Sequence, residues 1–173
     1  LMSKTALGSS CYSNLMSGNL SNPNRGSCSK GWSPGGWRNL GGNISNWCTL
    51  EAWRQAGYVY ATDYRNNSNV PWISLTGNAC GPNNPTTPFQ GGSPVPSQFV
   101  NSTDLVTMRE VLQQDEGSVL WHVLAAWLNA NLSKNTGAFQ YILTPDQVIA
   151  LASGGPIPGN LSLKAFLVST WQQ

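Results

Sequence analysis

The segment 116–131 is apolar on almost every side, and it constrains the fold more than any other part of the chain. Its apolar residues are Val119, Leu120, Trp121, Val123, Leu124, Ala125, Ala126, Trp127, Leu128 and Ala130. A helix that is apolar all round lies buried among other elements. We therefore expect 116–131 to form the central helix, with its polar residues Ser118, His122 and Asn129 on one narrow stripe.

Three more helices are predicted in the second half of the chain, over residues 104–113, 145–152 and 161–171. Apolar residues at helical spacing indicate the first, with Thr103 as its cap. The run 144–147 combines a capping Thr, a Pro at the first helical position and a Gln three residues after the cap. Asn160 is expected to cap the last helix. Its residues Leu163, Phe166, Leu167 and Val168 should face inward.

The first half is rich in Gly, Asn, Ser, Pro and Trp, and it indicates turns more than regular structure. Turn signals occur at 21–24, 33–36 and 81–85, and an extended loop is expected over 86–96. We predict a short helix over 50–56, capped by Thr49 and ended by Gly57, and short strands over 58–61 and 70–75. The expected fold is a single, mainly α domain (1–173). A loop-rich, disulfide-stabilised half (1–98) carries a four-helix layer (99–173).

The four cysteines, Cys11, Cys28, Cys48 and Cys80, all lie in the first half. The spacings typical of zinc sites are absent, and the chain has a single histidine, so no metal site is expected. Two disulfides in an oxidising compartment are the leading interpretation, with all three pairings open. Four reduced thiols in the core are the alternative.

Charged residues make up only 9% of the chain, whereas soluble domains average about 25%. The formal net charge of +2 and the absence of a Lys/Arg run argue against nucleic acid as a partner. No apolar run is long enough to span a membrane. The chain begins at Leu1 without a signal-peptide pattern, so we expect a processed mature N-terminus, although trimming would produce the same start. Composition and cysteines together indicate a secreted, extracellular protein.

Catalytic chemistry has weak support in the sequence. His122 lies one helical turn after Ser118, but no Gly-x-Ser-x-Gly segment presents a nucleophile, so a packed histidine is favoured over a catalytic one. The seven acidic residues show no pattern of their own, and a glycosidase-type carboxylate pair stays open because such pairs are assembled in space. We assign no catalytic residue and no cofactor.

Three tryptophans in the loop-rich half, Trp32, Trp37 and Trp47, are candidates for contact with a ligand or a neighbouring subunit, with burial in the core as the alternative. Asn-x-Ser/Thr patterns make candidate glycosylation sites of Asn19, Asn43, Asn66, Asn101 and Asn131. Asn160 has the same pattern but is expected to act as a helix cap.

Three segments resemble a loosely defined group of exported, mostly uncharacterised bacterial proteins. They are Trp32-Ser33-Pro34-Gly35-Gly36-Trp37-Arg38-Asn39, the stretch 120–129 and the stretch 163–171. The group carries a Cys followed by an S/T-P-G-Y-W-K-N-H-type segment, then an L-x-x-H-x-x-A-A-x-L-N helix and an L-K-x-x-L helix. This chain departs from the pattern at Gly36, Arg38 and Leu40. The resemblance implies export and architecture, and no activity.

The leading hypothesis is an extracellular structural subunit that assembles into a surface filament, tube or coat as a homo-polymer or homo-oligomer. Scarcity of charge supports it, because such a surface packs against copies of itself with little repulsion. A carbohydrate-binding or adhesive module, with polysaccharide as the partner of Trp32 and Trp37, is the alternative. A secreted hydrolase is the third.

Overall fold

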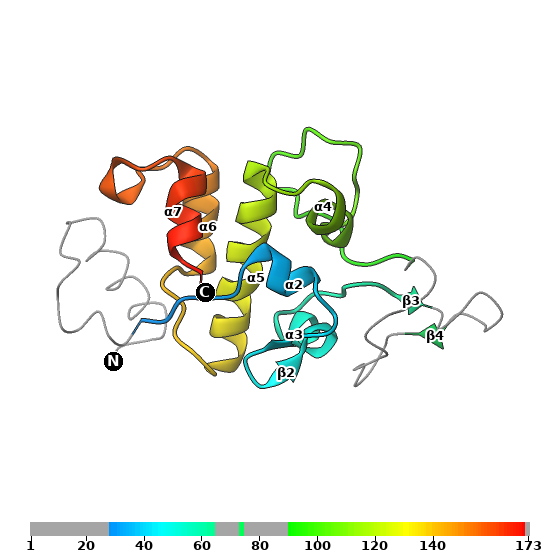
Figure 1. Cartoon of the computed structure of the whole chain (residues 1–173). Coiled ribbons are helices and arrows are strands. Elements are labelled where there is room, and N and C mark those ends of the chain that lie inside the picture. The colour runs from blue at the N-terminus through cyan, green and yellow to red at the C-terminus, as the bar shows by residue number, and fades with distance from the viewer. Residues whose placement is uncertain (1–27, 65–72, 75–89, 172–173) are drawn as a thin grey trace.

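The computed structural model describes residues 28–64, 73–74 and 90–171. Helix α5 (Val119–Thr136) runs through the middle of the molecule (Figure 1). Helices α6 (Pro145–Ala152) and α7 (Leu163–Ser169) lie on one side of it, and α4 (Met108–Gln114) lies on the other. The expectation of a mainly α fold with few short strands is confirmed.

Helix α5 is buried along almost its whole length, as its sequence predicts. It begins three residues later than expected because Gly117 has a φ of +84°, which lies outside helical geometry. Ser118 is therefore the cap, and its hydroxyl accepts a hydrogen bond from the Trp121 N–H. The helix continues to Thr136 and ends where Gly137 takes the left-handed conformation.

Helix α4 begins four residues later than the sequence predicted, and Thr107 caps it in place of Thr103. Thr107 and Glu110 form a reciprocal capping box. The preceding residues are held extended, since Val95 N–H donates to Val106 O at 2.9 Å and Met108 N–H donates to the Ser93 carbonyl at 2.9 Å. This pairing prevents a helix from starting at residue 104.

Helix α6 matches its prediction, and both bonds of the Thr144–Gln147 capping box are present. For α7 the predicted cap is wrong. Asn160 lies in the 3-10 turn η2 (Pro158–Asn160) with a φ of +55°, and Ser162 caps the helix. Phe166 and Leu167 face inward as expected, but Val168 is exposed.

Two short helices form in the first half. Helix α2 (Pro34–Arg38) lies where the sequence predicted a turn, and Ser33 caps it by accepting from the Gly36 N–H. Helix α3 (Thr49–Gln55) matches the expected helix, but Cys48 holds the cap position. The Thr49 hydroxyl, predicted to cap it, instead donates to Asn39 O at 2.6 Å.

The strands are two-residue pairs. Strand β1 (Asn43–Ile44) pairs antiparallel with β2 (Trp47–Cys48), and β3 (Asp63–Tyr64) pairs antiparallel with β4 (Ile73–Ser74). The strand expected over 58–61 is not formed. Strand β4 lies within the strand expected over 70–75, and the rest of that range lies outside the described residues. The turn signals at 21–24 and 81–85 lie outside the described residues.

One hydrophobic cluster contains buried residues from both halves of the chain, among them Trp37 and Trp53 from the first half and Leu124 and Leu128 from α5. Trp53 packs edge-on against Trp37, with ring centroids 6.2 Å apart, and its indole N–H donates to Trp37 O at 2.9 Å. The loop-rich half is anchored to the helical half by two other aromatic pairs, Trp32 with Phe139 and Tyr58 with Trp127. No helix in the described ranges is long and apolar enough to cross a membrane.

Candidate functional site

The segments 31–38, 120–129 and 163–171 meet along one side of α5. Asn129 holds the first of them. Its Oδ1 accepts from the Trp32 backbone N–H at 2.9 Å and from the Trp37 indole Nε1–H at 3.1 Å. Its Nδ2 donates to the Trp32 carbonyl at 2.8 Å. Asn129 is fully buried, and the loop-rich half satisfies the hydrogen bonds of its side chain.

Gly31 allows this close approach. A Cβ atom at this position would collide with the Asn129 amide group. The Gly31 N–H donates to Thr170 O at 2.8 Å, and Gly31 forms a parallel bridge with Trp171. The backbone before α2 is therefore clamped between α5 and the end of α7.

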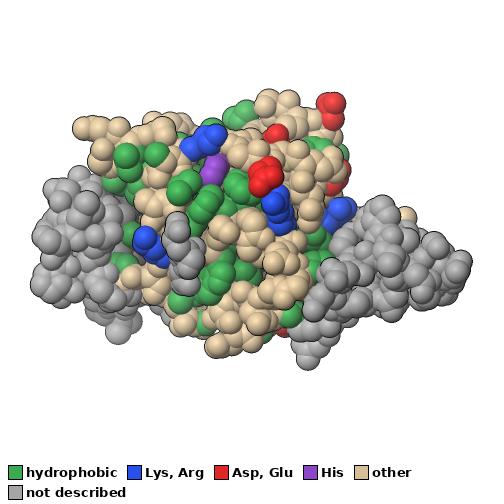
Figure 2. Space-filling view, viewed as in Figure 1, with side chains coloured by type: hydrophobic (Ala, Val, Ile, Leu, Met, Phe, Trp, Pro, Cys, Tyr) green, Lys and Arg blue, Asp and Glu red, His purple; other side chains and the backbone are tan. Residues whose placement is uncertain are grey.

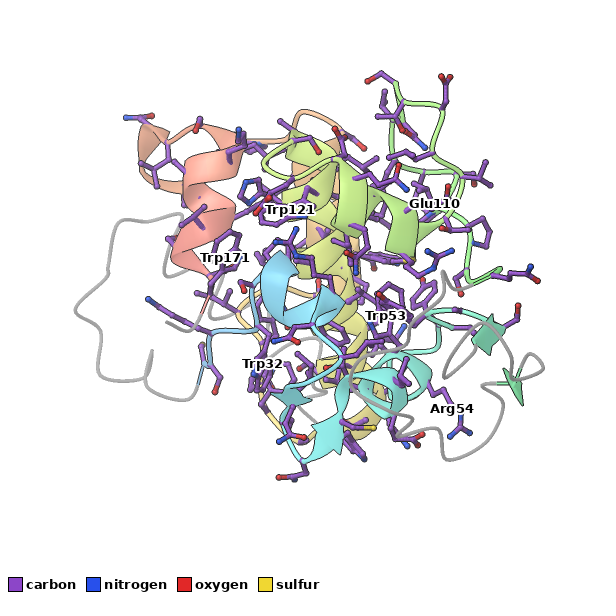
Figure 3. All side chains as sticks on the ribbon, turned by 45° about the vertical axis from the view of Figure 1, so that its right-hand side comes forward. Trp32, Trp53, Arg54, Glu110, Trp121 and Trp171 are labelled. Carbon is purple, nitrogen blue, oxygen red and sulfur yellow. The ribbon has the colours of Figure 1, made fainter. Side chains whose placement is uncertain are left out.

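His122 lies at the junction of α5 and α7. Its imidazole stacks on the Trp171 ring, with centroids 5.1 Å apart and planes 12° apart, and it meets Trp121 edge-on at 5.1 Å. Figure 3 shows Trp121 and Trp171 near each other between the two helices. Only 5% of the His122 surface is exposed, and Nδ1 is buried without a hydrogen-bond partner. Burial, and then the nearby Lys164 ammonium, lower the pKa of His122.

Arg38 connects α2 to this aromatic cluster. Its guanidinium lies over the Trp121 ring, 5.7 Å from the centroid, and donates to Leu112 O at 3.2 Å. It also forms an ion pair with Glu116 at 3.2 Å. Figure 2 shows the small exposed part of the histidine among hydrophobic side chains, with basic and acidic side chains nearby. Both partners of the ion pair are partly exposed to solvent, so packing on Trp121 is the stronger reason for the position of Arg38.

The contacts of His122 are those of a packing residue. A hydrolytic site of the Ser–His–acid type needs a nucleophile and an acid within hydrogen-bond reach of the imidazole. The ring neighbours of His122 are tryptophans, and the hydroxyl of Ser118 is used as the cap of α5. Across the described ranges, no three His, Cys, Asp or Glu side chains gather as metal ligands.

The three candidate tryptophans differ in exposure. Trp37 is fully buried and offers no face to a ligand. Trp32 and Trp47 are half-buried against the core, and Trp32 packs edge-on against Phe139 at 5.1 Å.

The candidate glycosylation sites also differ. Asn43 is exposed in β1. The Asn101 side chain holds a turn by donating to Leu105 O at 2.7 Å, and Asn131 lies within α5 and donates to Trp127 O at 2.8 Å. Asn19 and Asn66 lie outside the described residues.

Two of the four cysteines fall in the described part of the chain. Cys28 and Cys48 are disulfide-bonded there, and both pack against the hydrophobic core. Cys11 and Cys80 lie outside the described residues. All three pairings of the four cysteines therefore stay open.

A groove of about 390 Å³ lies between the loop 99–103 and the start of α5. Three buried side chains, Phe99, Leu120 and Val123, form its apolar floor. Val100, with 86% of its surface exposed, and Val119, with 48% exposed, stand at its rim. The sequence analysis missed this groove because its walls come from separate segments. The sequence shows only that Val119 is apolar and lies near the start of the predicted central helix.

No protein-family model, curated protein or solved structure matches this chain.

Proposed function

We propose that this chain is a secreted structural subunit that assembles with copies of itself into a filament, tube or coat at the cell surface. The observation that carries the proposal is a group of exposed aliphatic side chains around one groove. Val100, with 86% of its surface exposed, stands in the loop on one side of this groove, and Val119, with 48% exposed, stands on the facing helix. Contiguous exposed apolar surface on a folded protein marks a site of association.

The charge of the surface supports the same proposal. Figure 2 shows a face made mostly of uncharged side chains and backbone, with few charged groups between them. Charge repulsion normally keeps copies of a protein apart, and this chain carries a formal net charge of only +2. Copies can therefore approach one another without a large electrostatic penalty.

The secreted location rests on the cysteines. Disulfides persist in oxidising compartments and are rare in the cytosol of most cells. The bonded state of Cys28 and Cys48 supports export, and two disulfides among the four cysteines are part of this proposal. The resemblance of three segments to exported bacterial proteins agrees with the same location.

Self-association of the native, unreduced full chain tests the proposal. We expect the mass measured by sedimentation velocity and light scattering to rise with protein concentration, and negative-stain microscopy to show regular polymers. A Val100→Ser variant, which alters an exposed side chain at the groove, should shift assembly to higher concentration. A chain that stays strictly monomeric at the highest soluble concentration would refute the proposal.

An adhesive module that binds polysaccharide is the second candidate. It is favoured by Trp32 and Trp47, which are both only partly buried, because sugar rings stack on exposed aromatic faces. Titration with a panel of soluble polysaccharides should shift tryptophan fluorescence in the wild type, and the shift should shrink in Trp47→Ala. The absence of any shift across the panel would exclude this candidate.

A further inference from the structure

The groove beside α5 has an apolar floor and one charged group. Asp115 is the only charged residue among the described side chains that line it. This residue caps the end of α4, and its carboxylate has no hydrogen-bond or ion-pair partner among the described residues. The groove therefore suits an aliphatic side chain that has a cation close to it.

The segment between α6 and α7 offers this combination. Leu161 follows the turn η2, with 44% of its side chain exposed, and Lys164 stands exposed in the first turn of α7. Lys164 is the only charged residue between positions 153 and 171. In the part of the chain that the structure describes, its ammonium has no hydrogen-bond or ion-pair partner.

The position of Leu161 is built into the fold. Asn160, in the left-handed region at a φ of +55°, is the last residue of the 3-10 turn that immediately precedes Leu161. Figure 1 shows this segment projecting at the edge of the molecule, on the side of α5 away from α4. Leu161 is not among the residues that line the groove of its own copy.

We propose that the groove at the start of α5 binds Leu161 of a second copy of this chain, with Lys164 of that copy paired to Asp115. This contact rests on the proposed function, because it supplies the interface of the assembly. It joins two different surfaces, so a bound pair still presents one unused groove on one copy and one unused Leu161 on the other. Contacts of this kind propagate into open polymers unless the rotation between copies closes a ring.

Paired variants test the contact. Val119→Asp puts a charge at the groove rim, at a helix start where Asp is compatible with the fold, and Leu161→Ser removes the inserted side chain. Each should weaken self-association by about tenfold or more, because an aliphatic contact is lost. Val59→Ser, at an exposed aliphatic residue outside both surfaces, is the matched control and should associate like the wild type.

One mixture and one double variant make the test specific. A Val119→Asp copy keeps Leu161, and a Leu161→Ser copy keeps the groove, so the mixed variants should form a heterodimer although each associates only weakly with itself. Asp115→Lys and Lys164→Glu should each weaken association, and the double variant should recover it. Circular dichroism on each variant confirms folding.

The outcomes separate the two proposals. If the wild type assembles while Val119→Asp and Leu161→Ser assemble equally well, this contact is wrong and the structural role stands on another surface. The contact is also wrong if the two variants weaken assembly but their mixture forms no heterodimer. If the wild type is monomeric at every concentration, the proposed function fails, and the contact fails with it.

Discussion

Replacing Asn129 by alanine should destabilise the protein more than any other single polar substitution in α5. The change removes the acceptor of the Trp32 N–H and the Trp37 indole N–H and the donor to the Trp32 carbonyl. A buried group left without a partner costs about 1–3 kcal/mol, and half-buried peptide groups cost less because water reaches them. We expect the free energy of unfolding to fall by about 3 kcal/mol.

Urea unfolding of the unreduced protein, followed by circular dichroism and tryptophan fluorescence, measures this loss. Asn131→Ala is the matched control, because Asn131 lies two residues further along α5 and donates only to the Trp127 carbonyl within the helix. It should change the free energy of unfolding by less than about 0.5 kcal/mol. Equal effects of the two substitutions would show that Asn129 does not hold the loop-rich half against α5.

Three further predictions concern Gly31, His122 and Thr107. Gly31→Ala should lower the urea midpoint of unfolding, because the new Cβ atom would collide with Asn129. Gly35→Ala is the control and should leave the midpoint unchanged, because a Cβ atom there meets only Ser33 Oγ at 3.6 Å. Equal midpoints of the two variants would contradict the close approach of Gly31 to Asn129. Because the pKa of His122 is lowered by folding, the unfolded chain binds the extra proton, and stability should fall as pH drops below about 6.5. His122→Phe should lose that part of the pH dependence of the urea midpoint, and an unchanged profile would assign it to other groups. Thr107→Ala should cost about 1 kcal/mol of thermal or urea stability through loss of the capping box, and no change would mean that the pairing with 93–95 alone positions α4.

Local signals predicted the helices well. Helix α5 follows from its apolar composition, and α6 follows from the Thr144–Gln147 cap, because both depend on residues close together in sequence. The start of α4 was missed although Thr107 and Glu110 form the same kind of signal. The prediction placed the cap at Thr103 because local sequence does not show the pairing of 93–95 with 106–108. This pairing keeps the residues just before α4 extended.

The candidate site was less predictable. Asn129 and His122 were visible as polar residues on an apolar helix, but their partners Trp32 and Trp171 are 97 and 49 positions away along the chain. Helix α2 was read as a turn because Gly35 and Gly36 have poor helix propensity, and the Ser33 cap and the burial of Trp37 outweigh that propensity. The groove is lined by the loop 99–103, the start of α5 and the ends of α4 and α6, so composition alone does not predict it.

The hydrogen bond between Gly31 and Thr170 joins points near the two ends of the described chain. Closing a loop over such a separation costs conformational entropy, so this contact forms slowly. It cannot form before both residues are in the same compartment. A chain exported with its N-terminus first would carry an unpaired segment around Gly31, and a partly uncovered α5, until the last helix arrived. Completion of the fold would therefore follow translocation of the whole chain, and until then the apolar helix would need protection from aggregation.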